Sequence, residues 1–207
     1  KINDKAKKLS NEDSETFHHL TAKLLYLSKR ARPDLQTAVA FLCKRVKQPD
    51  VDDWKKLGRC IRYLRGTKGL FLTLEADGSG AIQWWIDASF AVHPDMKSHT
   101  GITMSLGKGS PYSSSTGQKL NTKSSTEAEL VGVDDGMPMV IWTRNFLIEQ
   151  GYKVSDNVVH QDNQSAILLE RNGRASSGRR TRHVNIRYFF VTDRVKNGEL
   201  RIEYCPT

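Results

Sequence analysis

The stretch Ile82-Gln-Trp-Trp-Ile-Asp87-Ala-Ser-Phe90 decides the fold, because it is an apolar run with a single acidic residue inside it. Its Trp and Ile content predicts a β-strand, and its scarcity of polar residues favours a central position in a sheet. A carboxylate in such a strand is costly unless it is paired or binds a metal ion. Asp87 is therefore a candidate metal ligand. Its alternative role is that of a strand-end Asp capping a turn.

Two more acidic residues follow in suitable contexts. Glu127 opens a helical pattern in Ser124-Ser-Thr-Glu127-Ala-Glu129, and Asp162 stands between a short apolar run and a helix. Each has a structural alternative, since Ser124 with Glu127 fits a capping box and Asp162 fits a helix N-cap. Carboxylate oxygens are the ligands that Mg²⁺ prefers. We expect Asp87, Glu127 and Asp162 to be catalytic and to bind two Mg²⁺ ions, with Mn²⁺ as a second option.

The order of elements predicts an α/β domain. Strands are expected at residues 70–74, 82–90, 99–106, 110–118, 158–161 and 199–204, and helices at 124–150, 163–172 and 184–195. Pro138 is expected to kink the long helix or to start a second segment. The first strands can pair antiparallel, and the later ones need crossovers, so the sheet should be mixed.

Residues 13–66 predict three short amphipathic helices with a basic exterior. The apolar positions recur at steps of three and four residues: Phe17, Leu20, Leu24 and Leu27, then Leu35, Val39, Leu42 and Val46, then Trp54, Leu57, Ile61 and Leu64. Residues 1–70 carry 17 Lys and Arg against 8 Asp and Glu, whereas residues 71–207 carry 15 of each. The basic part suggests a surface that grips a polyanion, and a solvated basic surface explains the charge equally well.

Composition and length narrow the class of protein. The 207 residues can bury a core, and no apolar stretch approaches the roughly 18 residues of a membrane span. The three cysteines show no CxxC spacing, which favours a reducing compartment. The first residue is Lys rather than Met, so a piece of a longer protein is expected.

Six short motifs follow one another along the chain, and their order is the basis for comparing it with a known family. They are Ala31-Arg-Pro-Asp34, Arg62-Tyr-Leu-Arg-Gly-Thr-Lys68, Asp87-Ala-Ser, Ser124-Ser-Thr-Glu-Ala-Glu129, Asp162-Asn-Gln-Ser-Ala166 and Arg182-His-Val-Asn-Ile-Arg-Tyr188. In these the chain resembles the end of the polyprotein of copia-type LTR retrotransposons, from about Phe17 to Thr207. The motif at residues 124–129 is the most specific of them.

The resemblance implies two domains and an activity. Residues 1–75 would be the thumb or connection segment of a reverse transcriptase, and 76–207 its RNase H domain. That domain has an RNase H-like mixed five-stranded sheet with flanking helices. It would hydrolyse the RNA strand of RNA–DNA hybrids by two-metal catalysis, with Asp87, Glu127 and Asp162 as the metal ligands. The implied partners are the hybrid and the rest of the polyprotein, with no membrane. The implied location is a cytoplasmic retrotransposon particle or the nucleus.

The chain also departs from the family pattern. The family has a fourth carboxylate on a helix after the last strand, whereas this chain stops at Cys205-Pro-Thr207. The domain is therefore expected to be truncated before its last helix, with no fourth carboxylate in this chain, since Asp193 lies on an earlier helix. Asp134-Asp135 lies within a predicted helix, not in a strand hairpin, so polymerisation is not expected.

Basic residues near the predicted site are candidates for phosphate contacts. The candidates are Lys119, Lys123, Arg174, Arg179, Arg180 and Arg182, and a solvated flexible loop is the alternative for the last four. His183 is a possible auxiliary residue, although a structural role at a helix start explains it as well. Two other functions stay open: an inactive nucleic-acid-binding module of the same fold, and an integrase-like strand transferase, against which the basic helices argue.

Overall fold

The computed structural model describes residues 3, 5–173 and 185–206, and the side chains of 185–188 are not described. It divides the chain into two compact units, residues 1–72 and 73–207. The sequence placed the boundary between residues 75 and 76.

The first unit contains three α-helices. They are α1 (Asn11–Arg30), α2 (Gln36–Cys43), which follows the 3₁₀ turn Pro33–Leu35, and α3 (Val51–Gly66). Their buried positions are those of the predicted apolar stripes, namely Phe17, Leu24, Leu35, Val39, Leu42 and Leu57. The stripes thus form one shared core, which leaves most of the basic side chains on the outside, whereas Arg32 is 7% exposed and pairs with Asp34.

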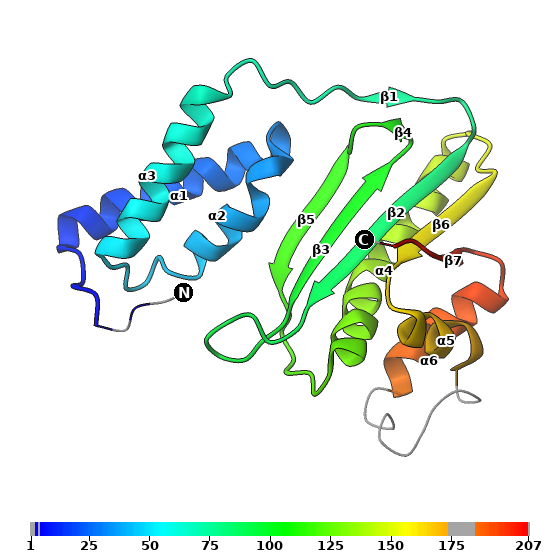
Figure 1. The fold of residues 1–207 in the computed structure, drawn as a ribbon. Coiled ribbons are helices and arrows are strands. Elements are labelled where there is room, and N and C mark those ends of the chain that lie inside the picture. The colour runs from blue at the N-terminus through cyan, green and yellow to red at the C-terminus, as the bar shows by residue number, and fades with distance from the viewer. Residues whose placement is uncertain (1–2, 4, 174–184, 207) are drawn as a thin grey trace. The chain divides into compact units, whose positions relative to one another are not determined.

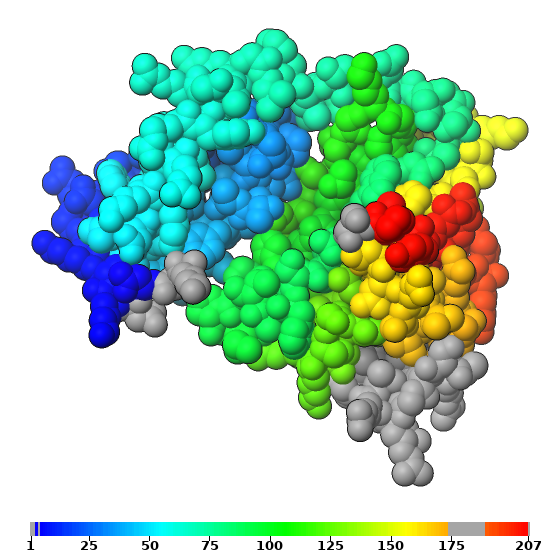
Figure 2. Space-filling model, in the orientation of Figure 1, coloured from blue at the N-terminus to red at the C-terminus, as the bar shows by residue number. Residues whose placement is uncertain are grey.

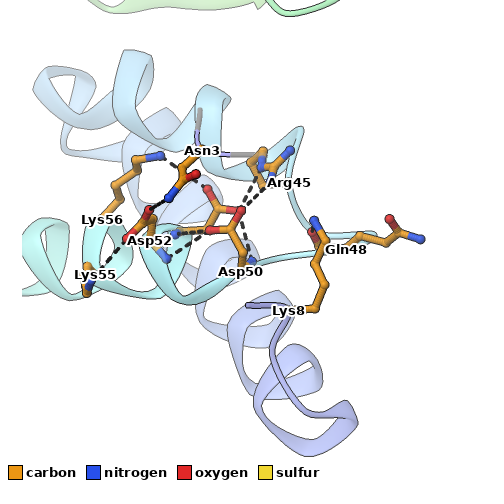
Figure 3. A network of polar contacts seen from close by, with 9 residues as sticks. Asn3, Lys8, Arg45, Gln48, Asp50, Asp52, Lys55 and Lys56 are labelled. Atoms are coloured by element: carbon orange, nitrogen blue, oxygen red, sulfur yellow. Dashed lines mark hydrogen bonds and ion pairs between the residues drawn. The ribbon is translucent and has the colours of Figure 1, made fainter. Parts of the chain in front are cut away.

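A buried ion-pair network fixes the start of α3 (Figure 3). Asp50 caps the helix by accepting hydrogen bonds from the backbone N–H groups of Asp52 and Asp53, and Asp53 accepts one from the N–H of Asp50. Arg45 pairs with both carboxylates, at 2.9 Å to Asp50 and 2.8 Å to Asp53. Asp50 and Asp53 are 2% and 1% exposed, so Arg45 compensates two buried negative charges.

Replacing Arg45 with Met should destabilise the first unit by about 3 kcal/mol, because removing one partner of a buried ion pair leaves an uncompensated charge. Lys56, at 3.5 Å from Asp53, limits the loss. The measurement is hydrogen exchange of the α1–α3 peptides, which reports on this unit alone. Lys55→Met is the control, since its pair with Asp52 is exposed and should contribute at most about 1 kcal/mol. Equal losses in both variants would contradict the prediction.

The second unit is built on a mixed five-stranded sheet in the order β5-β3-β2-β6-β7 (Figure 1). Its strands are β2 (Ala81–Ser89), β3 (His99–Ser105), β5 (Tyr112–Gly117), β6 (Asp156–Gln161) and β7 (Arg201–Tyr204). The pairs β5-β3 and β3-β2 are antiparallel, and β2-β6 and β6-β7 are parallel. The predicted fold class and the central position of the Asp87 strand are confirmed.

Helices cover one face of this sheet. They are α4 (Ser125–Glu149), α5 (Gln164–Asn172) and α6 (Asn185–Lys196). The residues of β2 that face them are buried, among them Ile82, Trp84 and Ile86, whereas Trp85 on the other face is 40% exposed. In Figure 2 the red C-terminal residues lie against the yellow and orange residues of β6 and α5, as the β6-β7 pairing requires. Among the described helices, none has the length and apolar character of a membrane span.

One prediction about elements is wrong, and one of the two alternatives at Pro138 does not apply. Residues 70–74 do not form a strand, and Leu70, Phe71 and Leu74 are exposed; only the two residues of β1 (Glu75–Ala76) pair, with β4 (Gly107–Lys108). The apolar run therefore finds no partner strand along its own length. Pro138 does not start a second segment, because α4 is continuous from Ser125 to Glu149.

Candidate metal centre

Three carboxylates of the second unit converge at the ends of β2 and β6. Asp87, Glu129 and Asp162 each offer an oxygen, and these three oxygens lie within 4.8 Å of one another. Two of the three are residues that the sequence predicts. The third is not Glu127 but Glu129, two positions further along α4.

Asp87 lies in the part of β2 that extends beyond its pairing with the parallel strand β6. The pairing of β2 with β6 ends at Trp85 and His160, while β2 itself continues to Ser89. The edge of β2 beyond Trp85 is therefore open on the β6 side, and the backbone N–H of Ala88 donates to Glu129 Oε1 at 3.2 Å. Asp87 is within the strand and not at a turn, so the turn-capping alternative does not apply.

Glu129 reaches this open edge because α4 lies unusually close to the sheet. An added Cβ at Gly136 would come within 2.9 Å of Ile86 Cδ1, and one at Gly132 would meet Thr100 and Ala88 at 3.4–3.5 Å. Glu129, Gly132 and Gly136 are spaced at three and four residues, so they share one helix face. Glu129 is 5% exposed, and its second oxygen accepts a hydrogen bond from Gln161 Nε2 at 3.2 Å.

Asp162 follows directly after β6 and is half-buried. The N-cap of α5 is not Asp162 but Asn163, whose side chain accepts a hydrogen bond from the N–H of Ala166 at 3.1 Å. The capping role that competes with metal binding is thus taken by the neighbouring residue. The carboxylate of Asp162 is left at the carboxyl end of a parallel strand, where α/β proteins place their sites.

Burial, and then the neighbouring negative charges, shift the pKa values of Glu129 and Asp87. Burial raises the pKa of Glu129 to about 7, with the charges of Asp87 and Asp162 adding to the rise and the hydrogen bonds from Gln161 and Ala88 opposing it. Partial burial, then the charge of Asp162, raises the pKa of Asp87. Negative charges that repel one another in this way favour a bound cation.

Glu127 has the structural role that the sequence left open. Its backbone N–H donates to Ser124 Oγ at 3.2 Å, and its Oε2 accepts from the backbone N–H of Lys123 at 2.7 Å. This is a variant of the capping box. The Glu127 side chain accepts from the backbone N–H of Lys123, whereas in the standard motif it would accept from that of the N-cap residue, Ser124. The prediction that Glu127 joins Asp87 and Asp162 is wrong, because residues 127 and 129 are about 200° apart around a helix.

A signal in the sequence could have identified Glu129. The capping box accounts for Glu127 fully, and the spacing Glu129-x-x-Gly132-x-x-x-Gly136 marks a face that approaches another backbone closely. The missing information was which face of α4 meets the sheet. That depends on tertiary packing and not on the helix itself.

The three residues fit a divalent cation. Their donor set consists of hard carboxylate oxygens only, with no Cys or His among them, which suits Mg²⁺ or Mn²⁺ better than Zn²⁺. The residues come from β2, α4 and the end of β6, all within one unit. Asp193, on α6, is outside this group and pairs with Arg194 at 3.7 Å.

The structure describes only some of the residues that are predicted to contact nucleic acid. Lys119 and Lys123 are exposed on the connection between β5 and α4, next to the helix that carries Glu129. Arg174, Arg179, Arg180, Arg182 and His183 lie outside the described residues. Their predicted contacts therefore stay predictions.

Comparison with known proteins gives related chains, although no protein-family model matches. The chain is 33% identical, over 188 residues and 90% of its length, to the retrovirus-related Pol polyprotein from transposon TNT 1-94 of Nicotiana tabacum. The chain is homologous to a segment of a transposon Pol polyprotein. It spans 14% of that relative, so the activities of the whole polyprotein do not transfer with the homology.

A solved structure shares the fold. The foamy viral protease–reverse transcriptase, solved in complex with an RNA/DNA hybrid, matches 96% of this chain and 27% of its own with a TM-score of 0.55 and 11% identity. A ribonuclease H1 isolated from compost matches 61% of this chain and 85% of its own, with a TM-score of 0.47 and 11% identity. This chain has an RNase H-like fold, as the sequence predicts.

Proposed function

We propose that residues 73–207 cleave the RNA strand of RNA–DNA hybrids, as the RNase H domain of a retrotransposon reverse transcriptase. The observation that supports this best is the convergence of Asp87, Glu129 and Asp162 at the ends of parallel strands. These carboxylates would hold two Mg²⁺ ions, with Mn²⁺ as a substitute. Bound divalent cations activate water and stabilise the charge that develops on the leaving oxygen.

The chain's own residues have distinct tasks in this proposal. Asp87 and Asp162 lie on the rim of the site, where the phosphate backbone can reach them, and Glu129 lies beneath them and buried. Lys119 and Lys123, with the basic stretch 174–182, would contact phosphates, which positions a hybrid without reading its sequence. Residues 1–72, with their basic helices, would serve as the thumb or connection and grip the same polyanion.

The test is cleavage of a hybrid with a 5′-labelled RNA strand, with Mg²⁺ or Mn²⁺, by the wild-type chain and by Asp87→Asn. The wild type should cut the RNA, and Asp87→Asn should cut it about 100- to 1,000-fold more slowly, because the amide lacks the negative charge that would hold the cation stabilising the transition state. Duplex DNA of the same sequence is the control substrate. Equal rates for both proteins would refute the proposal, and binding of the hybrid without cleavage would indicate an inactive module.

A further inference from the structure

Gln161, the last residue of β6, is a buried amide that contacts two residues of the candidate metal centre. It is 1% exposed, and its side chain makes three hydrogen bonds. Oε1 accepts from the backbone N–H of Asp162 at 2.8 Å and from that of Asn163 at 3.0 Å. Nε2 donates to Glu129 Oε2 at 3.2 Å.

These contacts fix which way the amide points. Backbone N–H groups can only donate, so the side-chain oxygen of Gln161 must face Asp162 and Asn163. The NH₂ group must then face Glu129, which accepts. Reversing the amide would set donor against donor and leave Glu129 facing an oxygen. The three bonds therefore specify a single orientation.

The result is a bridge between two of the three carboxylates. Through Gln161, the carboxylate of Glu129 is tied to the backbone of the turn that carries Asp162. Through the N–H of Ala88, its other oxygen is tied to the strand that carries Asp87. Each carboxylate oxygen of Glu129 is thus held by one donor, and the remaining lone pairs stay available to a cation.

A glutamine suits position 161 better than a glutamate or an apolar residue would. A Glu at 161 would add a fourth negative charge to a site where burial and repulsion already raise the pKa of Glu129. An apolar residue would leave the N–H groups of Asp162 and Asn163 and one oxygen of Glu129 without this partner. An amide can accept two hydrogen bonds and donate another while remaining neutral.

We propose that Gln161 is a positioning residue, which holds Glu129 and Asp162 in the arrangement that binds divalent cations. This inference rests on the proposed function. Groups that orient metal ligands without touching the metal typically change affinity by about 10- to 100-fold when they are removed. Gln161 should act by this route and not through the overall stability of the unit.

The test is calorimetric titration of the full chain with Mn²⁺, for the wild type and for Gln161→Met, a side chain of similar length. The variant should bind Mn²⁺ about 10- to 100-fold more weakly. Gln161→Asn, which keeps the amide but is one methylene shorter, should lose affinity as well, because it cannot span both partners. If Gln161→Met folds poorly, the Mn²⁺ affinity of Gln161→Asn still tests the proposal.

Asn157→Leu provides a matched control on the same strand. Asn157 is also a buried amide, 3% exposed, which accepts from Trp84 Nε1 and donates to the carbonyl of Glu199, each at 3.1 Å. It lies at the start of β6, away from the carboxylates. The control should lower the melting temperature but leave the Mn²⁺ affinity within about twofold of the wild type.

The outcomes separate the two proposals. If the wild type binds Mn²⁺ and both Gln161 variants bind it equally well, the positioning role is refuted and the metal centre stands. If Asn157→Leu weakens binding as much as Gln161→Met, the effect is one of stability and the positioning role is again refuted. If the wild type itself does not bind Mn²⁺, the proposed function is refuted, and the role of Gln161 with it.

Discussion

Glu129→Gln should slow metal-dependent hybrid cleavage by about 100- to 1,000-fold, whereas Glu127→Gln should leave it within about twofold of the wild type. The first change removes a buried negative charge from the cluster with Asp87 and Asp162. The second leaves the helix cap intact, because Gln can also accept the hydrogen bond from the N–H of Lys123. These two variants therefore distinguish the proposed metal ligand, Glu129, from the helix-capping residue, Glu127.

Metal-dependent stability gives an independent measurement of the same difference. A ligand that binds only the folded state stabilises it by about 2.7 kcal/mol at a concentration of 100 times its Kd. Mn²⁺ should therefore raise the melting temperature of the wild type and of Glu127→Gln, and raise that of Glu129→Gln far less. A Glu127→Gln variant that loses both cleavage and the Mn²⁺ effect, beside a normal Glu129→Gln, would restore the assignment made from the sequence alone.

Much of the fold can be predicted from the sequence, because local patterns determine it. The apolar run around Asp87 becomes the central strand, and the amphipathic stripes of residues 13–66 become a helical unit with a shared core. The prediction for residues 70–74 is wrong for a physical reason. Alternation and apolar content describe a segment that can pair, but a strand also needs a partner, and here only Glu75 and Ala76 find one.

The candidate site is less predictable, because it depends on which faces meet. Asp87 and Asp162 are set by strand ends, which the sequence marks well. Glu129 depends on the rotation of α4 about its own axis, and the motif around it contains two glutamates of equal chemical merit. Gln161 could not be identified at all, since nothing in a strand-end Gln indicates that its amide will meet a helix residue 32 positions earlier.

A buried carboxylate outside the cluster, that of Glu170, should reduce the stability of the protein. Glu170, on α5, is 0% exposed, and neither of its oxygens has a hydrogen-bond partner among the described residues. Burial raises its pKa to about 8, with the charge of Glu129 on α4 adding to the rise and that of Arg171 opposing it. The side chain of Arg171 is engaged with the carbonyl of Ile202 on β7.

Glu170→Met, a change to an apolar side chain of similar size, should increase the free energy of unfolding at every pH. The gain should be about 1–3 kcal/mol at pH 4.5, where the acid is protonated but lacks partners. It should grow towards pH 8, because the folded wild type holds a proton that the unfolded chain releases near its ordinary pKa of 4.5. Wild-type stability should fall across that window, by at most about 1.4 kcal/mol per pH unit, and level off above it.

Urea denaturation between pH 4.5 and 8.5 measures the free energy of unfolding of the wild type and of Glu170→Met. The control is Glu149→Met, at an exposed position on α4, which should keep the pH dependence of the wild type. The wild-type and Glu170→Met curves should diverge as pH rises and run parallel above about pH 8. Parallel curves over the whole range would mean that Glu170 carries its charge in the folded state with a partner. The divergence would identify Glu170 as a buried acid that lowers stability and whose pKa is raised further by the charge of Glu129.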